Sequence, residues 1–89
     1  MAHVGMLYKP DGTHVQVTPK DGKKFSLAEL QGYVEGLIER VPTTGRKTVW
    51  VNEEGIIHGL PYNAAGVRAA GYGPLVGNVL VVTGNGSKA

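Results

Sequence analysis

The alternation of apolar and polar residues predicts two strands at the N-terminus of the chain. A short apolar run from Val4 to Tyr8 ends at residues 9–12, where a proline presets φ and a glycine accepts a positive φ. Beyond this turn Val15 and Val17 alternate with polar residues, which is the period of a strand with one buried face. Two such runs joined by a tight turn indicate a β-hairpin.

The next segment has the signature of a helix start. After a second turn at residues 19–22, Ser26 and Glu29 have the three-residue spacing of a capping box. Apolar side chains then recur at helical spacing on one face: Leu27, Leu30, Val34, Leu37, Ile38 and Val41. A proline follows at position 42, and the residue before a proline disfavours helical geometry. We therefore predict an amphipathic helix from Ser26 to Arg40.

Two glycines interrupt the polar face of this predicted helix. Gly32 and Gly36 lie there near Glu35, and each glycine costs about 0.5–1 kcal/mol relative to alanine. Because glycines allow close approach of another backbone, Gly32, Glu35 and Gly36 form a candidate partner-binding surface. The alternative is that a helix held by its other face tolerates them, and chance placement in a chain with 14 glycines favours this alternative.

The middle of the chain predicts a second hairpin. Residues 48–51 are β-branched and aromatic enough for a central strand. Asn52-Glu53-Glu54-Gly55 would turn the chain back, and Ile56-Ile57 would begin a short returning strand.

A short helix and a last strand follow in the C-terminal part. Asn63 is placed to cap a helix through residues 64–70, which Gly71 would end. The nearly continuous apolar run at residues 76–83 is typical of a strand covered on both faces.

In this order the elements predict an α+β fold, β-β-α-β-β-α-β. We expect a small, mostly antiparallel sheet with one face covered by the amphipathic helix, and the short second helix at a sheet end. A chain of 89 residues supports one small core, so residues 1–84 are predicted to form a single domain. Residues 85–89 are predicted to be a frayed tail.

Composition and charge narrow the function classes. Hydrophobic residues at 42% and charged residues at 18% are ordinary for a globular protein. The net charge is only +2 and the basic residues are scattered along the chain. We therefore do not expect nucleic-acid binding, and we expect only weak retention of the protein on heparin. The absence of cysteine excludes disulfides, thiolate nucleophiles and cysteine-based zinc sites. No apolar run approaches the roughly 18 residues of a membrane span, so we expect a soluble, cytoplasmic protein.

Metal and serine chemistry receive little support from the residues. His3, His14 and His58 stand in three different segments without a paired-histidine motif, so neither a metal nor a cofactor is expected. Adjacent Glu53 and Glu54 are more often solubilising than an acid–base pair. A small hydrolase-like enzyme using these carboxylates and His58 is nevertheless kept as an alternative.

The densest group of polar and aromatic residues follows the predicted central strand, at strand ends and turns. We take it as the candidate ligand-binding site, and its members are Asn52, Glu53, Glu54, His58, Tyr62, Asn63 and Arg68. The amides of Asn52 and Asn63 could bind a polar ligand, the ring of Tyr62 could stack on it, and Arg68 could bind its phosphate or acid group. Asn52 and Asn63 also have structural explanations, as a turn residue and a helix cap, and these are favoured.

Several stretches of the chain resemble an uncharacterised family, domain of unknown function 3846. The resemblance rests on residues 25–31, 34–36, 51–55, 59–65 and 77–81, in that order along the chain. It implies a small intracellular protein, encoded by a phage or other mobile DNA, that modifies or blunts host processes. Such proteins act by binding, so we expect a binder of a host protein or of a small signalling nucleotide. Counter-defence is one role open to such a binder, and a homo-oligomer is one of its open states. The alternatives are the small enzyme above and a weak nucleic-acid-binding protein.

Overall fold

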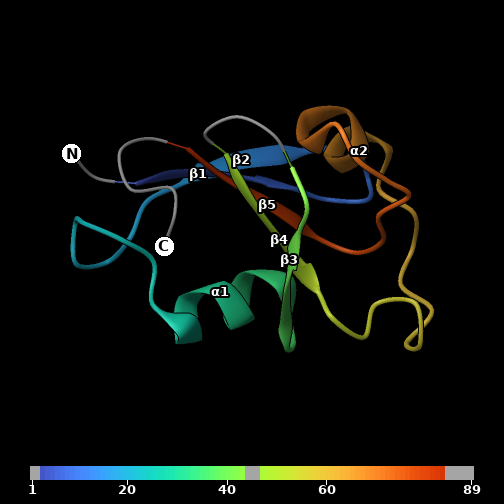
Figure 1. The fold of residues 1–89 in the computed structure, drawn as a ribbon, viewed down its shortest axis with the longest axis horizontal. Coiled ribbons are helices and arrows are strands. Elements are labelled where there is room, and N and C mark those ends of the chain that lie inside the picture. The colour runs from blue at the N-terminus through green and yellow to red at the C-terminus, as the bar shows by residue number, and fades with distance from the viewer. Residues whose placement is uncertain (1–2, 44–46, 84–89) are drawn as a thin grey trace.

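The computed structural model describes residues 3–43 and 47–83, which fold as five strands and two helices (Figure 1). The elements are β1 Val4–Tyr8, β2 His14–Val17, α1 Leu27–Val34, β3 Ile38–Val41, β4 Thr48–Asn52, α2 Ala64–Ala70 and β5 Val79–Thr83. All pairings in the sheet are antiparallel, and the strand order is β2-β1-β5-β4-β3. The predicted α+β class is confirmed, and the element types follow in the predicted order, but the third strand is residues 38–41 and the fourth is residues 48–52.

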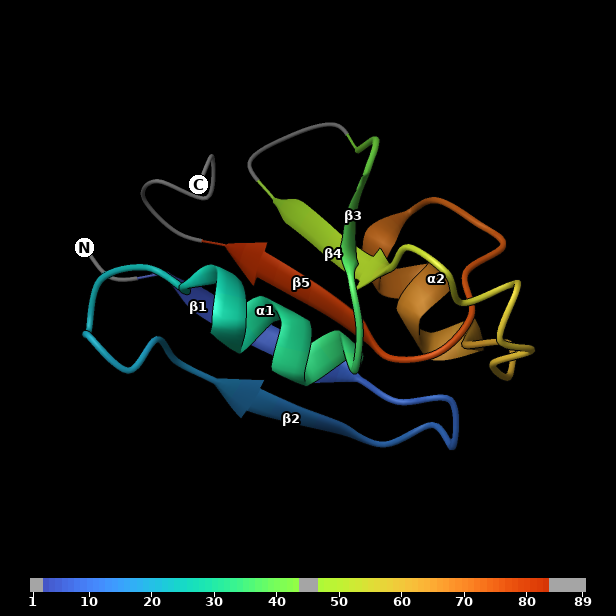
Figure 2. The same cartoon turned by 90° about the horizontal axis from the view of Figure 1, so that it is seen from below.

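The sheet separates two apolar clusters, one under each helix. Figure 1 shows α1 on one side of the sheet and α2 on the other, and Figure 2 shows α1 lying across β1 and β5. The side chains of β5 alternate between the clusters: Leu80 and Val82 pack with α1, whereas Val79 and Val81 pack with α2. The prediction that this strand is covered on both faces is therefore confirmed.

The first hairpin and the start of α1 form as predicted, but β2 does not have the buried face that its alternation indicated, since Val15 is 47% exposed. Gly12, at φ 93°, donates its backbone N–H to the Lys9 carbonyl at 3.0 Å and closes the turn between β1 and β2. At the helix start the Ser26 Oγ accepts from the Glu29 N–H at 3.1 Å, and the Glu29 carboxylate accepts from the Ser26 N–H at 2.9 Å. This reciprocal pair is the predicted capping box.

The predicted extension of this helix to Arg40 is wrong. The helix ends at Val34, and Glu35 adopts the left-handed conformation at φ 62°. Residues 38–41 instead form β3, an edge strand that pairs with β4 in the register Val41↔Val49. Apolar spacing at positions 34, 38 and 41 fits a helix, but the pairing with β4 decides the conformation of the last four residues.

The predicted strand at Ile56 and Ile57 is also wrong. β4 already pairs with β3 on one side and with β5 on the other, so it has no free edge for a returning strand. Residues 53–59 form consecutive turns instead, in which the His58 N–H bonds the Glu54 carbonyl at 3.0 Å. The hairpin partner of β4 is therefore β3, which precedes it in the chain.

From Asn63 onward the chain follows its prediction closely. α2 is capped by Asn63 and ends at Gly71, which has φ 71°. Gly66 inside this helix allows a close approach, because a Cβ there would lie 2.6 Å from the Val79 Cγ2 atom. β5 begins at Val79 and not at position 76, since Gly77 has a positive φ of 72°.

Two remaining expectations concern the ends and the membrane. The predicted tail at residues 85–89 lies outside the described residues. Neither helix within residues 3–43 and 47–83 has the length and apolarity that a membrane crossing requires.

Candidate functional site

The predicted ligand-binding residues gather at one end of the sheet, but they do not share one cavity. β4 ends there, β5 begins there, and both the turn after β4 and α2 lie beside this end (Figure 1). The residues separate into two buried asparagines, an exposed turn and a hollow beside α2.

Asn52 is buried and its side chain is fully used by the fold. Its Nδ2 donates to the carbonyls of Val34 and Glu35, both at 3.2 Å, and thereby satisfies the end of α1. Its Oδ1 accepts from the Glu54 N–H at 2.8 Å. Asn52 therefore connects α1, β4 and the beginning of the following turn.

Asn63 is fully buried and connects three further segments. Its Nδ2 donates to the Tyr8 carbonyl at 2.9 Å and to the Gly77 carbonyl at 2.8 Å, while its Oδ1 accepts from the Gly66 N–H at 2.8 Å. Both Nδ2 hydrogens and the Oδ1 atom of this amide are thus engaged by backbone groups. Both asparagines thus have the structural role that the sequence favoured, and they hold the surroundings of the site.

The turn that Asn52 supports carries two exposed isoleucines, and we call residues 53–59 the isoleucine turn. Ile56 is 83% exposed and Ile57 is 81% exposed. The turn is anchored beneath them, because the Gly55 N–H bonds the Asn52 carbonyl at 3.1 Å and a Cβ on Gly55 would lie 2.8 Å from Val76 Cγ2. The sequence pattern assigned these isoleucines to a strand, so their exposure was missed.

The polar residues of the isoleucine turn form an exposed pair. His58 Nε2 lies 3.4 Å from Glu54 Oε1, and both side chains reach solvent. An exposed pair of this kind stabilises a turn by at most about 1 kcal/mol. In the part of the chain that the structure describes, no group of three potential metal-ligating residues exists.

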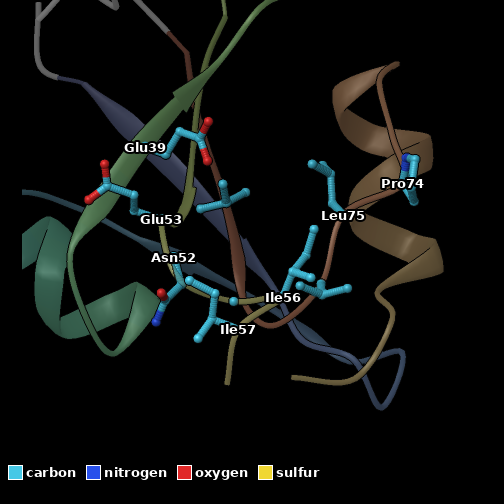
Figure 3. A pocket seen from close by; sticks show the side chains of 10 residues that line it. Glu39, Asn52, Glu53, Ile56, Ile57, Pro74 and Leu75 are labelled. Atoms are coloured by element: carbon cyan, nitrogen blue, oxygen red, sulfur yellow. The ribbon is translucent and has the colours of Figure 1, made fainter. Parts of the chain in front are cut away.

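A small pocket opens between the isoleucine turn and the segment before β5. It encloses about 120 Å³, and we call it the acidic pocket. Its lining includes Glu39, Glu53, Ile56, Ile57, Leu75 and Val76. In Figure 3 Glu39 and Glu53 lie on one side of the pocket, with the Glu53 carboxylate pointing away from that of Glu39, and Ile56 and Leu75 lie on the other side. Such a pocket suits a lysine or arginine side chain, with its aliphatic stem on the isoleucines and its charge near the carboxylates.

No side chain among the described residues neutralises the charge of this pocket. Among the described residues neither Glu39 nor Glu53 has a side-chain hydrogen bond or ion pair. Three other acids are held by local hydrogen bonds. The Thr13 hydroxyl lowers the pKa of Asp11, the Lys23 N–H lowers the pKa of Asp21, and the Ser26 N–H lowers the pKa of Glu29.

Tyr62 and Arg68 belong to a different surface. They line a shallow hollow of about 550 Å³ together with Val67, Tyr72, Pro74 and two glycines, and we call it the tyrosine hollow. Pro74 is the one residue that lines both this hollow and the acidic pocket. Tyr72, which was not among the predicted site residues, lines this hollow together with Arg68.

The predicted glycine surface is not a helix face. Gly32 lies on α1 with open space where a Cβ would be, but Glu35 and Gly36 follow the end of that helix. A Cβ on Gly36 would lie 2.6 Å from the Asn52 Nδ2 atom. The close approach at Gly36 is therefore made by the protein's own asparagine.

Comparison with known proteins identifies one family. The family model described as Domain of unknown function (DUF3846) matches residues 4–89, a range that begins with β1 and extends beyond β5. No curated protein matches the chain, and no solved structure matches it. The resemblance seen in the sequence motifs is thereby confirmed.

Proposed function

We propose that the chain, which belongs to the Domain of unknown function (DUF3846) family, is a non-enzymatic protein that binds a partner protein through its isoleucine turn. The carrying observation is the exposure of Ile56 and Ile57, at 83% and 81%, on a turn that the fold anchors from below. Adjacent exposed aliphatic side chains with polar neighbours are typical of protein interaction sites.

The pocket beside the turn defines the chemistry of the partner. Burying an isoleucine side chain contributes about 1.5–3 kcal/mol, so two of them supply the apolar centre of an interface. The carboxylates of Glu39 and Glu53 require a basic rim on the partner, with one lysine or arginine side chain in the acidic pocket. An anionic membrane surface fits less well, because these carboxylates would face lipid headgroups of the same sign.

The biological setting of the proposal follows from the family resemblance. The protein would be a phage-encoded accessory protein in the host cytoplasm, where it binds a host protein and blunts a host process such as defence. The isoleucine turn supports the binding part of this proposal, since its anchored backbone presents two exposed aliphatic side chains.

The test compares matched aspartate substitutions in exposed aliphatic residues. Wild type, Ile56→Asp and Ile57→Asp are compared with Val15→Asp, which changes an exposed valine on β2. Proteins retained from host lysate are quantified, and the retained partner is then purified and titrated by calorimetry. We expect each isoleucine variant to weaken the complex by about tenfold or more, whereas the control binds as wild type.

Charge reversal and salt provide a second readout. Glu39→Lys and Glu53→Lys should each weaken binding, and added salt should weaken the wild-type complex because it screens the charges. Equal affinity of wild type and both isoleucine variants would refute the proposal. If the wild-type chain forms a dimer and Ile56→Asp dissociates it, the partner at the isoleucine turn would be a second copy of this chain and not another protein.

The enzymatic alternative is tested separately. Glu53, Glu54 and His58 were its candidate residues, and the paired Glu54 and His58 lie in solvent rather than in the acidic pocket. Substrate turnover that Glu54→Gln abolishes without loss of folding would favour an enzyme. Strong, salt-sensitive retention on heparin would favour the nucleic-acid-binding alternative.

A further inference from the structure

We infer that the tyrosine hollow is a separate binding site for a small anion that carries a planar ring, of the class of a nucleoside monophosphate. The site lies beside the C-terminal end of α2 and uses none of the residues of the isoleucine turn. It would supply the chain with a ligand-dependent function in addition to the proposed protein binding.

The floor of the hollow is apolar and held in place by packing. Val67 on α2 and Pro74 in the following loop both line it. A Cβ on Gly73 would lie 2.7 Å from Val67 Cγ2, so glycine allows the loop to lie directly on the helix. A flat ring can therefore rest on a surface that does not need to rearrange.

Two tyrosines provide the aromatic surfaces of the hollow. Tyr62 is 55% exposed and Tyr72 is 46% exposed, so both rings remain available to a ligand. The backbone of Tyr62 is held by an antiparallel bridge to Val76, and Tyr72 follows the helix end at Gly71. Stacking on aromatic side chains is a general way in which proteins bind a nucleobase, because every base has a π-face.

The hollow contains one cation that the fold leaves free. The Arg68 side chain has no hydrogen bond or ion pair with any described residue. The neighbouring Lys47 is already engaged, since its Nζ donates to the Ala69 carbonyl at 3.0 Å and so compensates the helix end. The free guanidinium presents a planar fork of donors that matches a phosphate group.

The size and charge of the hollow favour one nucleotide over a nucleic acid strand. Its volume of about 550 Å³ lies within the range of small-ligand sites. Its lining contains one cationic side chain and no carboxylate, which matches a single phosphate. A strand of nucleic acid needs a track of cations, and the chain's net charge of +2 does not supply one.

The experiment titrates the full chain with three probes: adenosine monophosphate, adenosine and ribose 5-phosphate. Calorimetry and amide chemical shifts are measured for each probe. We expect adenosine monophosphate to bind, with shifts at Tyr62, Tyr72 and Gly73. Adenosine loses the phosphate contact and ribose 5-phosphate loses the stacking, so each should bind about tenfold more weakly or worse.

Matched variants separate this site from the rest of the surface. Arg68→Gln and Tyr72→Leu should each weaken the binding of adenosine monophosphate by about tenfold, and Arg68→Lys should retain part of the wild-type affinity. Arg40→Gln, at an exposed arginine on β3, should leave the affinity unchanged. Ile56→Asp should also leave it unchanged, so failure of the partner-binding proposal and failure of this inference are distinguishable.

Three results would overturn the inference. The first is absence of shifts in the hollow with millimolar adenosine monophosphate. The second is an Arg68→Gln variant that binds it as wild type does. The third is an oligonucleotide that binds more tightly than the mononucleotide with a steep dependence on salt, which would identify a nucleic-acid surface instead.

Discussion

Replacing Asn63 by alanine tests how strongly one buried amide holds the end of the sheet. The substitution removes three hydrogen bonds and leaves the Tyr8 and Gly77 carbonyls and the Gly66 N–H without their partner. Each lost bond between buried groups costs about 1 kcal/mol, and an unsatisfied buried group costs up to about 3 kcal/mol. We therefore expect the free energy of unfolding to fall by about 3–4 kcal/mol.

This loss is large for a domain of 89 residues. At about 0.05–0.15 kcal/mol per residue, the total free energy of unfolding is roughly 4–13 kcal/mol. Because 1 kcal/mol corresponds to about 4–8 °C for a domain of this size, the melting temperature should fall by at least about 12 °C. Circular dichroism during thermal and urea unfolding measures both quantities.

The matched control is Asn78→Ala. The Asn78 Nδ2 makes one hydrogen bond, to the Tyr33 carbonyl at 3.0 Å, and the residue is only partly buried. The control should therefore cost about 1 kcal/mol. A loss for Asn63→Ala no larger than that of the control would show that the three bonds do not anchor the sheet end, and the structural role assigned to this amide would be refuted.

Three further predictions concern stability. Gly66→Ala should lower the free energy of unfolding by about 1–3 kcal/mol, because its Cβ would lie 2.6 Å from a β5 side chain. Gly32→Ala has open space around it and should raise the free energy of unfolding by about 0.5–1 kcal/mol. Urea unfolding measures both changes, and the opposite sign for either variant would contradict its prediction. Ile56→Ser with Ile57→Ser should change the free energy of unfolding by less than about 0.5 kcal/mol, and a larger loss in the same assay would mean that the isoleucines support the fold. Hydrogen bonds lower the pKa of the Glu29 carboxyl in the folded protein, so the ionised carboxylate stabilises the fold above pH 4.5, its ordinary pKa, and this stability is lost as the pH falls through the lower folded pKa. Glu29→Gln should therefore reduce the loss of unfolding free energy at acidic pH. The same loss in the variant and in wild type would contradict this prediction.

The sequence predicted where the candidate site lies, but not that its residues separate into different surfaces. The sequence placed Glu53, His58, Tyr62 and Arg68 at one strand end, and the structure places all four at the same end of the sheet. Which of them share a hollow depends on how the segment before β5 lies between the turn and α2. No periodicity in the sequence reports that arrangement.

Local chemistry determined the elements that depend on neighbouring residues. The capping box of Ser26 and Glu29, the turn at Gly12 and the cap of α2 by Asn63 use partners three residues away at most, so their residue types and spacing are sufficient. The alternating and continuous apolar runs likewise identified β2 and β5 and, with them, the α+β class.

The tertiary structure alone decided where α1 ends and what becomes of Ile56 and Ile57. The spacing of Ile38 and Val41 fits a helix, and only the available edge of β4 makes residues 38–41 a strand, with these two side chains in the clusters on opposite faces of the sheet. The same pairing occupies the position that a strand at the two isoleucines would need, so they remain in solvent. Competition for a sheet edge is a contact between distant segments, and for that physical reason it is absent from local spacing.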